Sequence, residues 1–302
     1  MTDSSKRILV VGAGFAGMWS ALGAARLLDI ANKSGERIEV VLIAPEPMLH
    51  LRPRLHESNP LGMKAPLLPL FEATGIRFVQ GSVSEIRAAA REVEAIGEDG
   101  KPFTIRYDKL VLASGSSLFR PPVPGLATAA FSIDQIEDAA LLEVHLRQLA
   151  EQPDTPARNS VVVVGGGFTG IEIATELPAR LRSMLGSTTA VNVIVIEQAD
   201  AIGPDLGPGP RPVIEQALTE LGITVRLGTA VSAIDTDGIV TSTGERIDAK
   251  TVIWTAGMRA NALTKKLDAE RDRLGRLHVD TDLRVLGTHC LLYTSPSPRD
   301  RQ

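Results

Sequence analysis

Short hydrophobic runs that end in glycines form the clearest pattern along this chain. Residues 8–11 and 161–164 are continuous apolar runs. Each run leads through a glycine-rich turn into a stretch that we interpret as a helix, and a further apolar run follows at residues 38–43 and 191–196. A continuous apolar run is typical of a parallel strand that is buried on both faces. The pattern therefore predicts two strand–helix–strand units.

The same order of parts occurs twice. ILVVGAGFAG at residues 8–17 corresponds to VVVVGGGFTG at 161–170, and YDKLVLASG ending at residue 115 corresponds to DAKTVIWTAG ending at residue 257. Alternating sequence with turn signals such as Asp99-Gly100 and Asp237-Gly238 lies between these parts and indicates small antiparallel meanders. A repeat of this kind indicates a duplicated domain. We expect an α/β fold of two Rossmann-like domains, each with a parallel sheet and a small antiparallel β-meander.

Both turns have the G-x-G-x-x-G spacing between a strand and a helix that dinucleotide-binding sites require. The first glycine permits the bend, the second lets a pyrophosphate approach the backbone, and the third lets the helix pack against the strand. The helix N-terminus adds free N–H groups and a positive potential. These glycines are Gly12, Gly14 and Gly17 in the first copy and Gly165, Gly167 and Gly170 in the second. A single such turn is also compatible with a merely tight connection, but two in register favour two nucleotide sites.

The two copies differ at the end of their second strand. Glu197 ends this strand in the second copy, where a carboxylate can accept hydrogen bonds from an adenosine ribose. Its charge would repel a ribose 2′-phosphate, so we expect a preference for NAD(H) over NADP(H). The alternative is a solvated acid at a strand end. The first copy has Ala44 at this position, and Glu46 is the nearest acid.

Composition narrows the range of functions. The chain has 302 residues, which at roughly 150 residues per domain suggests about two domains. It is 44% hydrophobic and 23% charged, as in ordinary globular proteins, and its net charge of −4 argues against non-specific nucleic-acid binding. Cys290 is the single cysteine, so we expect neither a disulfide nor a paired-thiol redox site. The five histidines are scattered and predict no metal site.

Neither end of the chain has a recognisable targeting signal. Residues 1–6 are polar, and no apolar run approaches the ~20 residues that span a bilayer, so we expect a cytoplasmic protein. Residues 289–302 end in a stretch rich in Ser, Pro and Arg without strand or helix periodicity. We expect this stretch to be a disordered, non-native tail joined to a truncated gene.

The ordered set VVGAGFAG, LVLASG, PPVPG, GGGFTGIEIATEL and WTAGMRANAL resembles the flavoproteins with two dinucleotide-binding domains, which include the pyridine nucleotide-disulfide oxidoreductase superfamily. The resemblance runs from about residue 8 to residue 286 and is greatest to the type II NADH dehydrogenases. Disulfide reductases of the superfamily need a redox cysteine pair, which is absent before Cys290. The Gly-Asp that closes the last strand in this family is absent as well.

The resemblance implies FAD at the first fingerprint and NAD(H) at the second. Glu172 would lie near the junction of nicotinamide and flavin as the catalytic residue, although an acid in a first helical turn also fits a purely stabilising role. Arg54 would lie near the flavin or else belong to a solvated basic loop. The residues implied in cofactor binding are Gly12, Ala13, Gly14, Phe15, Ala16, Gly17, Glu46, Arg54, Val83, Ser114 and Gly115 for FAD, Gly165, Gly166, Gly167, Phe168, Thr169, Gly170 and Glu197 for NAD(H), and Gly257.

We therefore expect an FAD-dependent oxidoreductase that passes electrons from NADH to a quinone or another small acceptor without a redox disulfide. The alternatives are a ferredoxin-type reductase and a non-catalytic NAD(H)-responsive redox sensor. A third hypothesis is that this chain is an inactive fragment. The expected domains are an FAD part over residues 1–122, an NAD(H) domain over 123–258 and a return to the FAD domain over 259–288. Contact with a membrane surface is expected only through a C-terminal region that the resemblance implies and the chain lacks.

Overall fold

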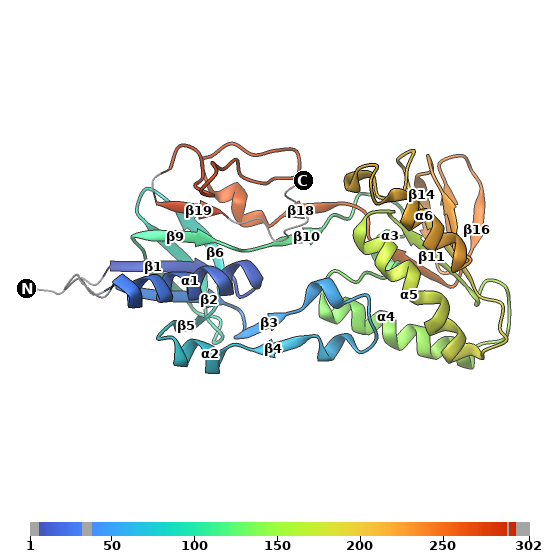
Figure 1. The fold of residues 1–302 in the computed structure, drawn as a ribbon, viewed down its shortest axis with the longest axis horizontal. Helices are drawn as coiled ribbons and strands as arrows, with labels where there is room; N and C mark the ends of the chain where they lie inside the picture. The colour runs from blue at the N-terminus through green and yellow to red at the C-terminus, as the bar shows by residue number, and fades with distance from the viewer. Residues whose placement is uncertain (1–5, 32–37, 289, 294–302) are drawn as a thin grey trace, which may run out of the picture. The chain divides into compact units, whose positions relative to one another are not determined.

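The protein divides into two compact units, each built around a parallel sheet (Figure 1). The structure is a computed structural model that describes residues 6–31, 38–288 and 290–293. The first unit takes its residues from Met1–His50, Lys64–Ser117 and Met258–Arg301, and the second from Leu51–Met63 and Leu118–Gly257. Neither unit is therefore one continuous stretch of chain.

The first unit contains a five-stranded sheet in the order β19-β9-β1-β2-β5, with all neighbours parallel. Helix α1 (Phe15–Ala31) connects the central strand to its neighbour β2. Val11, the last residue of β1, lies opposite Ile43 on one side and Leu112 on the other. The strands are β1 (Lys6–Val11), β2 (Ile38–Ala44), β5 (Arg77–Gln80), β9 (Lys109–Leu112) and β19 (Leu291–Tyr293).

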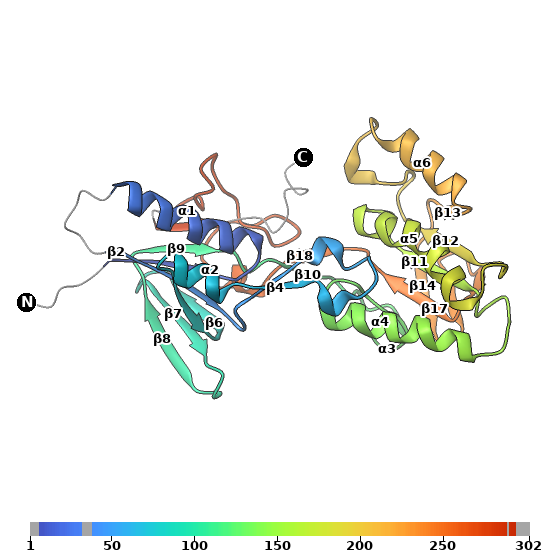
Figure 2. The same ribbon diagram turned by 60° about the horizontal axis from the view of Figure 1, so that its bottom comes forward.

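An antiparallel meander of strands β6 (Ser82–Arg87), β7 (Glu92–Ile96) and β8 (Pro102–Arg106) belongs to the same unit (Figure 2). Val93 and Ala95 alternate with Glu92 and Glu94 along β7, so one face of the meander is apolar. This face joins the buried cluster that contains Leu9 and Leu110 of the parallel sheet. The meander thus covers part of that sheet.

Short elements complete the first unit and its connections. Helix α2 (Leu68–Ala73) precedes β5. Two small sheets pair β3 (Met48–His50) with β4 (Lys64–Pro66), and β10 (Ser116–Leu118) with β18 (Met258–Ala260). The 3-10 helices of the whole chain, as far as it is described, are Arg52–Arg54, Pro60–Gly62, Leu149–Glu151, Pro204–Leu206 and Ala262–Lys266.

The second unit repeats this plan with a four-stranded parallel sheet in the order β13-β12-β11-β17. Helix α5 (Phe168–Leu185) follows β11, and an antiparallel meander of three strands precedes β17. The sheet strands are β11 (Ser160–Val164), β12 (Asn192–Ile196), β13 (Thr224–Arg226) and β17 (Thr251–Trp254). The other elements are α3 (Leu126–Ala129), α4 (Ile136–Gln148), α6 (Arg211–Glu220), β14 (Val231–Asp235), β15 (Gly238–Thr241) and β16 (Arg246–Asp248).

The four valines of β11 show why this strand is apolar throughout. Successive side chains of a strand point to opposite faces. Val161 and Val163 join the buried cluster that α4, α5 and α6 contribute to, whereas Val162 and Val164 join the cluster that includes the meander and α3. Both faces of the strand are therefore covered, as the continuous apolar run predicted.

These observations confirm the expected fold class of parallel sheets with small antiparallel meanders. Two segments differ from expectation. Residues 291–293 were expected in a disordered tail, but they form β19 beside β9, because Leu291 and Tyr293 are each 3% exposed and enter the core of the first unit. Residues 289 and 294–302 of the expected tail lie outside the described residues. Leu51–Met63 belongs to the second unit although it falls within the expected first domain.

Candidate functional site

The first glycine turn connects β1 to α1 in very little space. Gly12 has a φ of +112°, and its N–H donates to the Ile43 carbonyl oxygen at 2.9 Å. A Cβ atom on Gly12 would lie 2.3 Å from the Ala113 carbonyl oxygen, and one on Gly17 would lie 1.9 Å from the Gly12 carbonyl oxygen. No heavy atom lies within 4 Å of the corresponding position on Gly14. The first and third glycines are thus required by packing, and the second leaves the backbone open to a ligand.

The second glycine turn has the same geometry. Gly165 has a φ of +110°, and a Cβ atom on it would lie 2.8 Å from the Thr255 hydroxyl oxygen. The position of a Cβ on Gly170 is 1.8 Å from the Gly165 carbonyl oxygen, whereas Gly167 again has open space around it. The Thr255 hydroxyl donates to the Val164 carbonyl oxygen at 3.0 Å and so joins β17 to this turn. Each unit therefore presents an open backbone at the start of a helix, as a phosphate group requires.

Ser114 supplies a polar group beside the first turn. It follows Ala113, whose carbonyl lies against Gly12, at the carboxyl end of β9. Its hydroxyl oxygen is buried and has no hydrogen-bond partner among the described residues. Buried hydroxyls are normally hydrogen-bonded, so this atom and the open space at Gly14 fit a polar ligand such as the FAD pyrophosphate. Gly115, with a φ of +73°, accepts a hydrogen bond from the Asn261 N–H at 3.0 Å.

Glu197 is fixed beside the second turn. One oxygen of its carboxylate accepts the Gly166 N–H at 2.6 Å, and the other accepts the Ala199 N–H at 2.7 Å. A Cβ on Gly166 would lie 3.0 Å from the Glu197 Cβ and 2.7 Å from Ile202 Cδ1, so a side chain there would displace both neighbouring side chains. A carboxylate oxygen has two lone pairs, so each oxygen keeps a lone pair for a ribose hydroxyl. This arrangement agrees with the position expected for Glu197.

Glu172 lies in the second turn of α5 and not in the first, where the expected stabilising role would place it, and it faces an unexpected partner. Its Oε2 atom is 3.8 Å from Nδ1 of His56, and the two side chains are 27% and 17% exposed. His56 belongs to Leu51–Met63, which packs in the same unit. The sequence analysis missed His56, since no motif or periodicity connects these two positions.

The other expected site residues have simpler surroundings. Glu46 pairs with His50 at 2.6 Å in the first unit. Arg54 pairs with Glu57 at 2.6 Å and belongs to the second unit, so the structure does not place it in the unit of the first fingerprint. The Arg54–Glu57 hydrogen bond and attraction raise the pKa of Arg54 and lower that of Glu57.

Two further expected residues lie outside the two glycine turns. Val83 lies in β6 opposite Ala95, and Gly257, with a φ of +79°, accepts a hydrogen bond from the Phe119 N–H at 2.8 Å. The remaining ones occupy the two turns and the first turns of their helices, and they are Ala13, Phe15, Ala16, Phe168 and Thr169.

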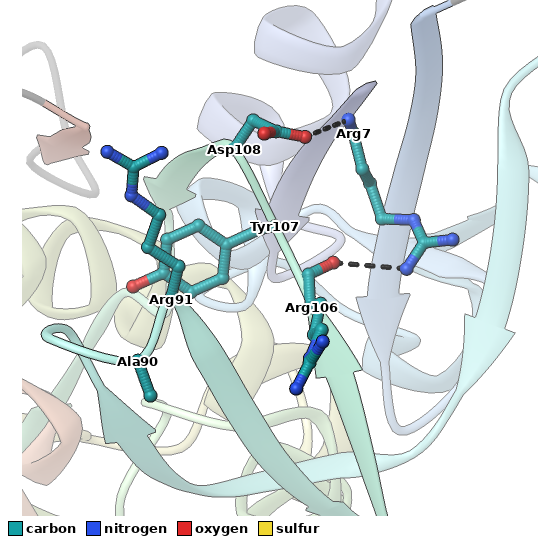
Figure 3. Close-up of a pocket in the computed structure, with 6 residues that line it drawn as sticks. All are labelled: Arg7, Ala90, Arg91, Arg106, Tyr107 and Asp108. Atoms are coloured by element: carbon teal, nitrogen blue, oxygen red, sulfur yellow. Dashed lines mark hydrogen bonds between the residues drawn. The ribbon is translucent and has the colours of Figure 1, made fainter. Parts of the chain in front are cut away.

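One cavity of the first unit lies apart from these residues (Figure 3). It is at the amino ends of β1 and β9, whereas Gly12 and Ser114 follow the carboxyl ends of the same strands. Burial raises the pKa of Tyr107 in its wall to about 12. Two of its arginines are already paired, Arg7 with Glu39 at 2.9 Å and Arg106 with Glu92 at 2.9 Å. The lining consists of Arg7, Ala90, Arg91, Arg106, Tyr107 and Asp108 and includes no expected site residue.

Among the described residues, no group of three His, Cys, Asp or Glu side chains is arranged to hold a metal ion. No helix of the described ranges has both the length and the apolar character that a membrane span needs.

Comparison with known proteins agrees with the geometry of the two turns. The NADH dehydrogenase-like protein MT1860 of Mycobacterium tuberculosis (strain CDC 1551 / Oshkosh) is 43% identical over 283 residues, which are 93% of this chain and 70% of that protein. A type II NADH:quinone oxidoreductase of Staphylococcus haemolyticus (strain JCSC1435) is 25% identical over 95% of this chain and 73% of its own length. The fold is similar to that of NDH2 from Plasmodium falciparum in complex with NADH, with a TM-score of 0.77 and 18% identity.

That structural alignment covers 96% of this chain but only 64% of the Plasmodium chain, so the protein spans about two thirds of this neighbour. A family model for pyridine nucleotide-disulphide oxidoreductases matches residues 6–289. This match confirms the expected superfamily and, with it, the cofactors of that family, FAD and a pyridine nucleotide. The chain belongs to the pyridine nucleotide-disulphide oxidoreductase family.

Proposed function

We propose that this protein is an FAD-dependent oxidoreductase that takes electrons from NADH and delivers them to a quinone. One observation supports the proposal most strongly: the described residues form two open glycine turns, and beside the second stands the Glu197 carboxylate, whose counterpart in the first copy is Ala44. The names of two relatives, an NADH dehydrogenase-like protein and a type II NADH:quinone oxidoreductase, agree with it.

The residues of the first turn fit FAD. Gly14 offers an accessible backbone, and the Ser114 hydroxyl is a buried group in need of a partner. The N-terminus of α1 adds N–H groups and a positive potential for the pyrophosphate. When bound, FAD supplies the two-electron chemistry, and the protein orients it and excludes water.

The residues of the second turn fit NADH. Gly167 leaves room for the pyrophosphate, and the Glu197 carboxylate is already oriented by two backbone N–H groups. Because its position is fixed, binding a ribose costs little additional ordering of this side chain. A 2′-phosphate would meet the same negative charge, so NADPH is expected to bind more weakly.

Glu172 is the proposed catalytic residue. It is part of the helix that follows the second turn, and it is partly exposed. From this position its carboxylate would hold or accept a proton during reduction of the acceptor. Nδ1 of His56 lies 3.8 Å from Oε2 of this carboxylate.

A quinone is the proposed acceptor, and it needs no redox dithiol. Cys290 is the single cysteine of this sequence, so no dithiol within it can take up the electrons. The quinone is also the acceptor named for the Staphylococcus relative.

The test follows the colour of the flavin in the FAD-loaded protein under anaerobic conditions. NADH is expected to bleach the flavin absorbance at least tenfold faster than NADPH at equal concentration, since the charge of Glu197 disfavours the 2′-phosphate. Addition of a soluble quinone is then expected to reoxidise the flavin and restore its absorbance. Equal rates with both nucleotides would contradict the role of Glu197. A reduced flavin that persists with every quinone tried would contradict the proposed acceptor and favour a redox sensor.

A further inference from the structure

Leu51–Met63, which we call the docking segment, is bound firmly to the second unit. It lies in the chain between β3 and β4 of the first unit, yet its contacts are with the second. Leu55 is 2% exposed and is part of the apolar cluster that contains Ile173 and Leu177 of α5. Burial of a leucine side chain to this extent contributes about 1.5–3 kcal/mol, so the segment has a strong apolar anchor.

Two arginines anchor the segment on either side of Leu55. The guanidinium of Arg52 contacts the Asp134 carboxylate, and its Nε donates to the Asp134 carbonyl oxygen at 3.0 Å. Arg180 of α5 donates from Nη1 to the His56 carbonyl oxygen at 2.9 Å and contacts the buried Glu143 carboxylate at 2.5 Å. The backbone of His56 is therefore held directly by the helix that carries Glu172.

This anchoring directs the His56 side chain at Glu172. Nδ1 of His56 is 3.8 Å from Oε2 of Glu172, which is within the range of an ion pair but long for a direct hydrogen bond. The charged groups near His56 include Arg180, which holds its carbonyl, and the exposed Arg54–Glu57 pair on the same segment. Glu57 also interacts electrostatically with His56, but it is hydrogen-bonded to Arg54, and Arg180 is engaged by Glu143. Glu172 is the acid of α5 that lies within ion-pair distance of His56.

We propose that His56 is a positioning residue for Glu172. A positively charged imidazole at this distance attracts the carboxylate toward the docking segment, whereas a neutral imidazole attracts it less. The inference rests on the role proposed above for Glu172 and adds a second residue to it. We propose no contact between His56 and either cofactor, so His56 acts only through the Glu172 carboxylate.

A double-mutant cycle tests this coupling. We would compare the wild type, His56→Gln, Glu172→Gln and the double variant, all loaded with FAD, and measure the rate of flavin bleaching by NADH and reoxidation by a soluble quinone between pH 5.5 and 8.5. His56→Gln is expected to slow the step that depends on Glu172 by about tenfold and to flatten its pH profile, but to have less than a twofold effect in the Glu172→Gln background. The same fold-loss in both backgrounds would overturn the proposal, because a merely structural role of His56 does not depend on Glu172.

A second readout needs neither FAD nor activity. Thermal melting of the unloaded chain is measured for the same four proteins at pH 6. The two single variants are expected to lower the melting temperature, and the double variant is expected to lower it by less than their sum. Strict additivity would show that the two side chains do not interact and would overturn the proposal.

His278→Gln is the matched control. Nδ1 of His278 is also 3.8 Å from a glutamate oxygen, that of Glu270, but the side chains are 48% and 87% exposed. It is expected to change neither readout, because solvent screens an exposed pair.

The outcomes for Glu172→Gln separate this inference from the proposed function. Normal flavin kinetics in Glu172→Gln would refute the role of Glu172 and this inference together, whereas slow kinetics in Glu172→Gln without coupling to His56 would refute only the inference.

Discussion

At the end of β12, the Glu197 side chain connects strand, turn and ligand site. Its two oxygens accept hydrogen bonds from the N–H groups of Gly166 and Ala199. The carboxylate therefore connects the end of β12 to the glycine turn that follows β11. Hydrogen bonds to an ionised acceptor are worth roughly 1.5–3 kcal/mol each. The orientation that these bonds impose is the one that a ribose diol would meet.

Glu197→Gln is expected to weaken NADH binding about tenfold. An amide has one acceptor oxygen, so its NH₂ group would face one of the two backbone N–H groups and the side chain would lose its fixed orientation. The same change is expected to narrow the preference for NADH over NADPH, because the repelling charge is gone. Titration of nucleotide fluorescence measures both constants. Glu220→Gln, at an exposed acid on α6, serves as the control, and unchanged NADH affinity in Glu197→Gln would contradict the assignment.

Gly170→Ala is expected to lower the stability of the protein, whereas Gly167→Ala is expected to lower its affinity for NADH. The new Cβ at residue 170 would lie 1.8 Å from the Gly165 carbonyl oxygen, so α5 must move away and the melting temperature should fall, by the equivalent of about 1–3 kcal/mol or more. At residue 167 nothing lies within 4 Å, so the protein should keep its melting temperature and lose affinity for NADH, because the methyl group occupies the approach of the pyrophosphate. Thermal melting and nucleotide titration of both variants check the pair. Equal loss of stability in the two would contradict this division of roles.

Helix α4 packs on the sheet of the second unit through a histidine. Nε2 of His145 is 2.9 Å from the Thr251 hydroxyl of β17, and its ring centroid is 4.4 Å from that of Phe131. Burial lowers the pKa of His145 from its ordinary value. The neutral ring is therefore the form that fits between the helix and the sheet.

Acid is expected to destabilise this helix–sheet contact. Since the pKa of His145 is lower in the folded than in the unfolded protein, the unfolded state binds more protons near pH 6. Stability from this group is complete above the ordinary histidine value of about 6.5 and falls as the pH decreases through that value toward the folded one. His145→Gln should thus show a smaller drop in melting temperature between pH 7.5 and 5.5 than the wild type. A drop equal to that of the wild type would show that other groups cause the acid sensitivity.

At the scale of the molecule, the sequence was informative where structure is local and repeated. The runs at 8–11 and 161–164 and the glycines that follow them predicted both parallel sheets and both open turns, because strand burial and turn geometry leave their mark on neighbouring positions. Glu197 was found by its distance along the chain from the second turn. These features account for most of the fold and most of the candidate nucleotide sites.

The features that the sequence did not predict depend on contacts between distant segments. His56 meets Glu172 only because Leu55, Arg52 and Arg180 bind the docking segment to the second unit, and none of these contacts has a periodic signature. Likewise, Leu291–Tyr293 is too short to show a strand pattern, and β9 supplies the edge with which it pairs. Arg54 lies in the second unit and is paired with Glu57, and its expected position near the flavin stays a prediction beside the alternative of a solvated basic loop.

The placement of the docking segment also bears on how the protein is made. Leu55 leaves the ribosome well before the helices α4 and α5 that enclose it, so this leucine must stay unburied while more than a hundred further residues are synthesised. The first unit waits as well, because its core brings Leu9 together with Leu277 and Val285. Domains usually fold one after another as they emerge. Here neither unit can complete its core until segments far apart in the sequence have been synthesised, so the two units are expected to close at similar times.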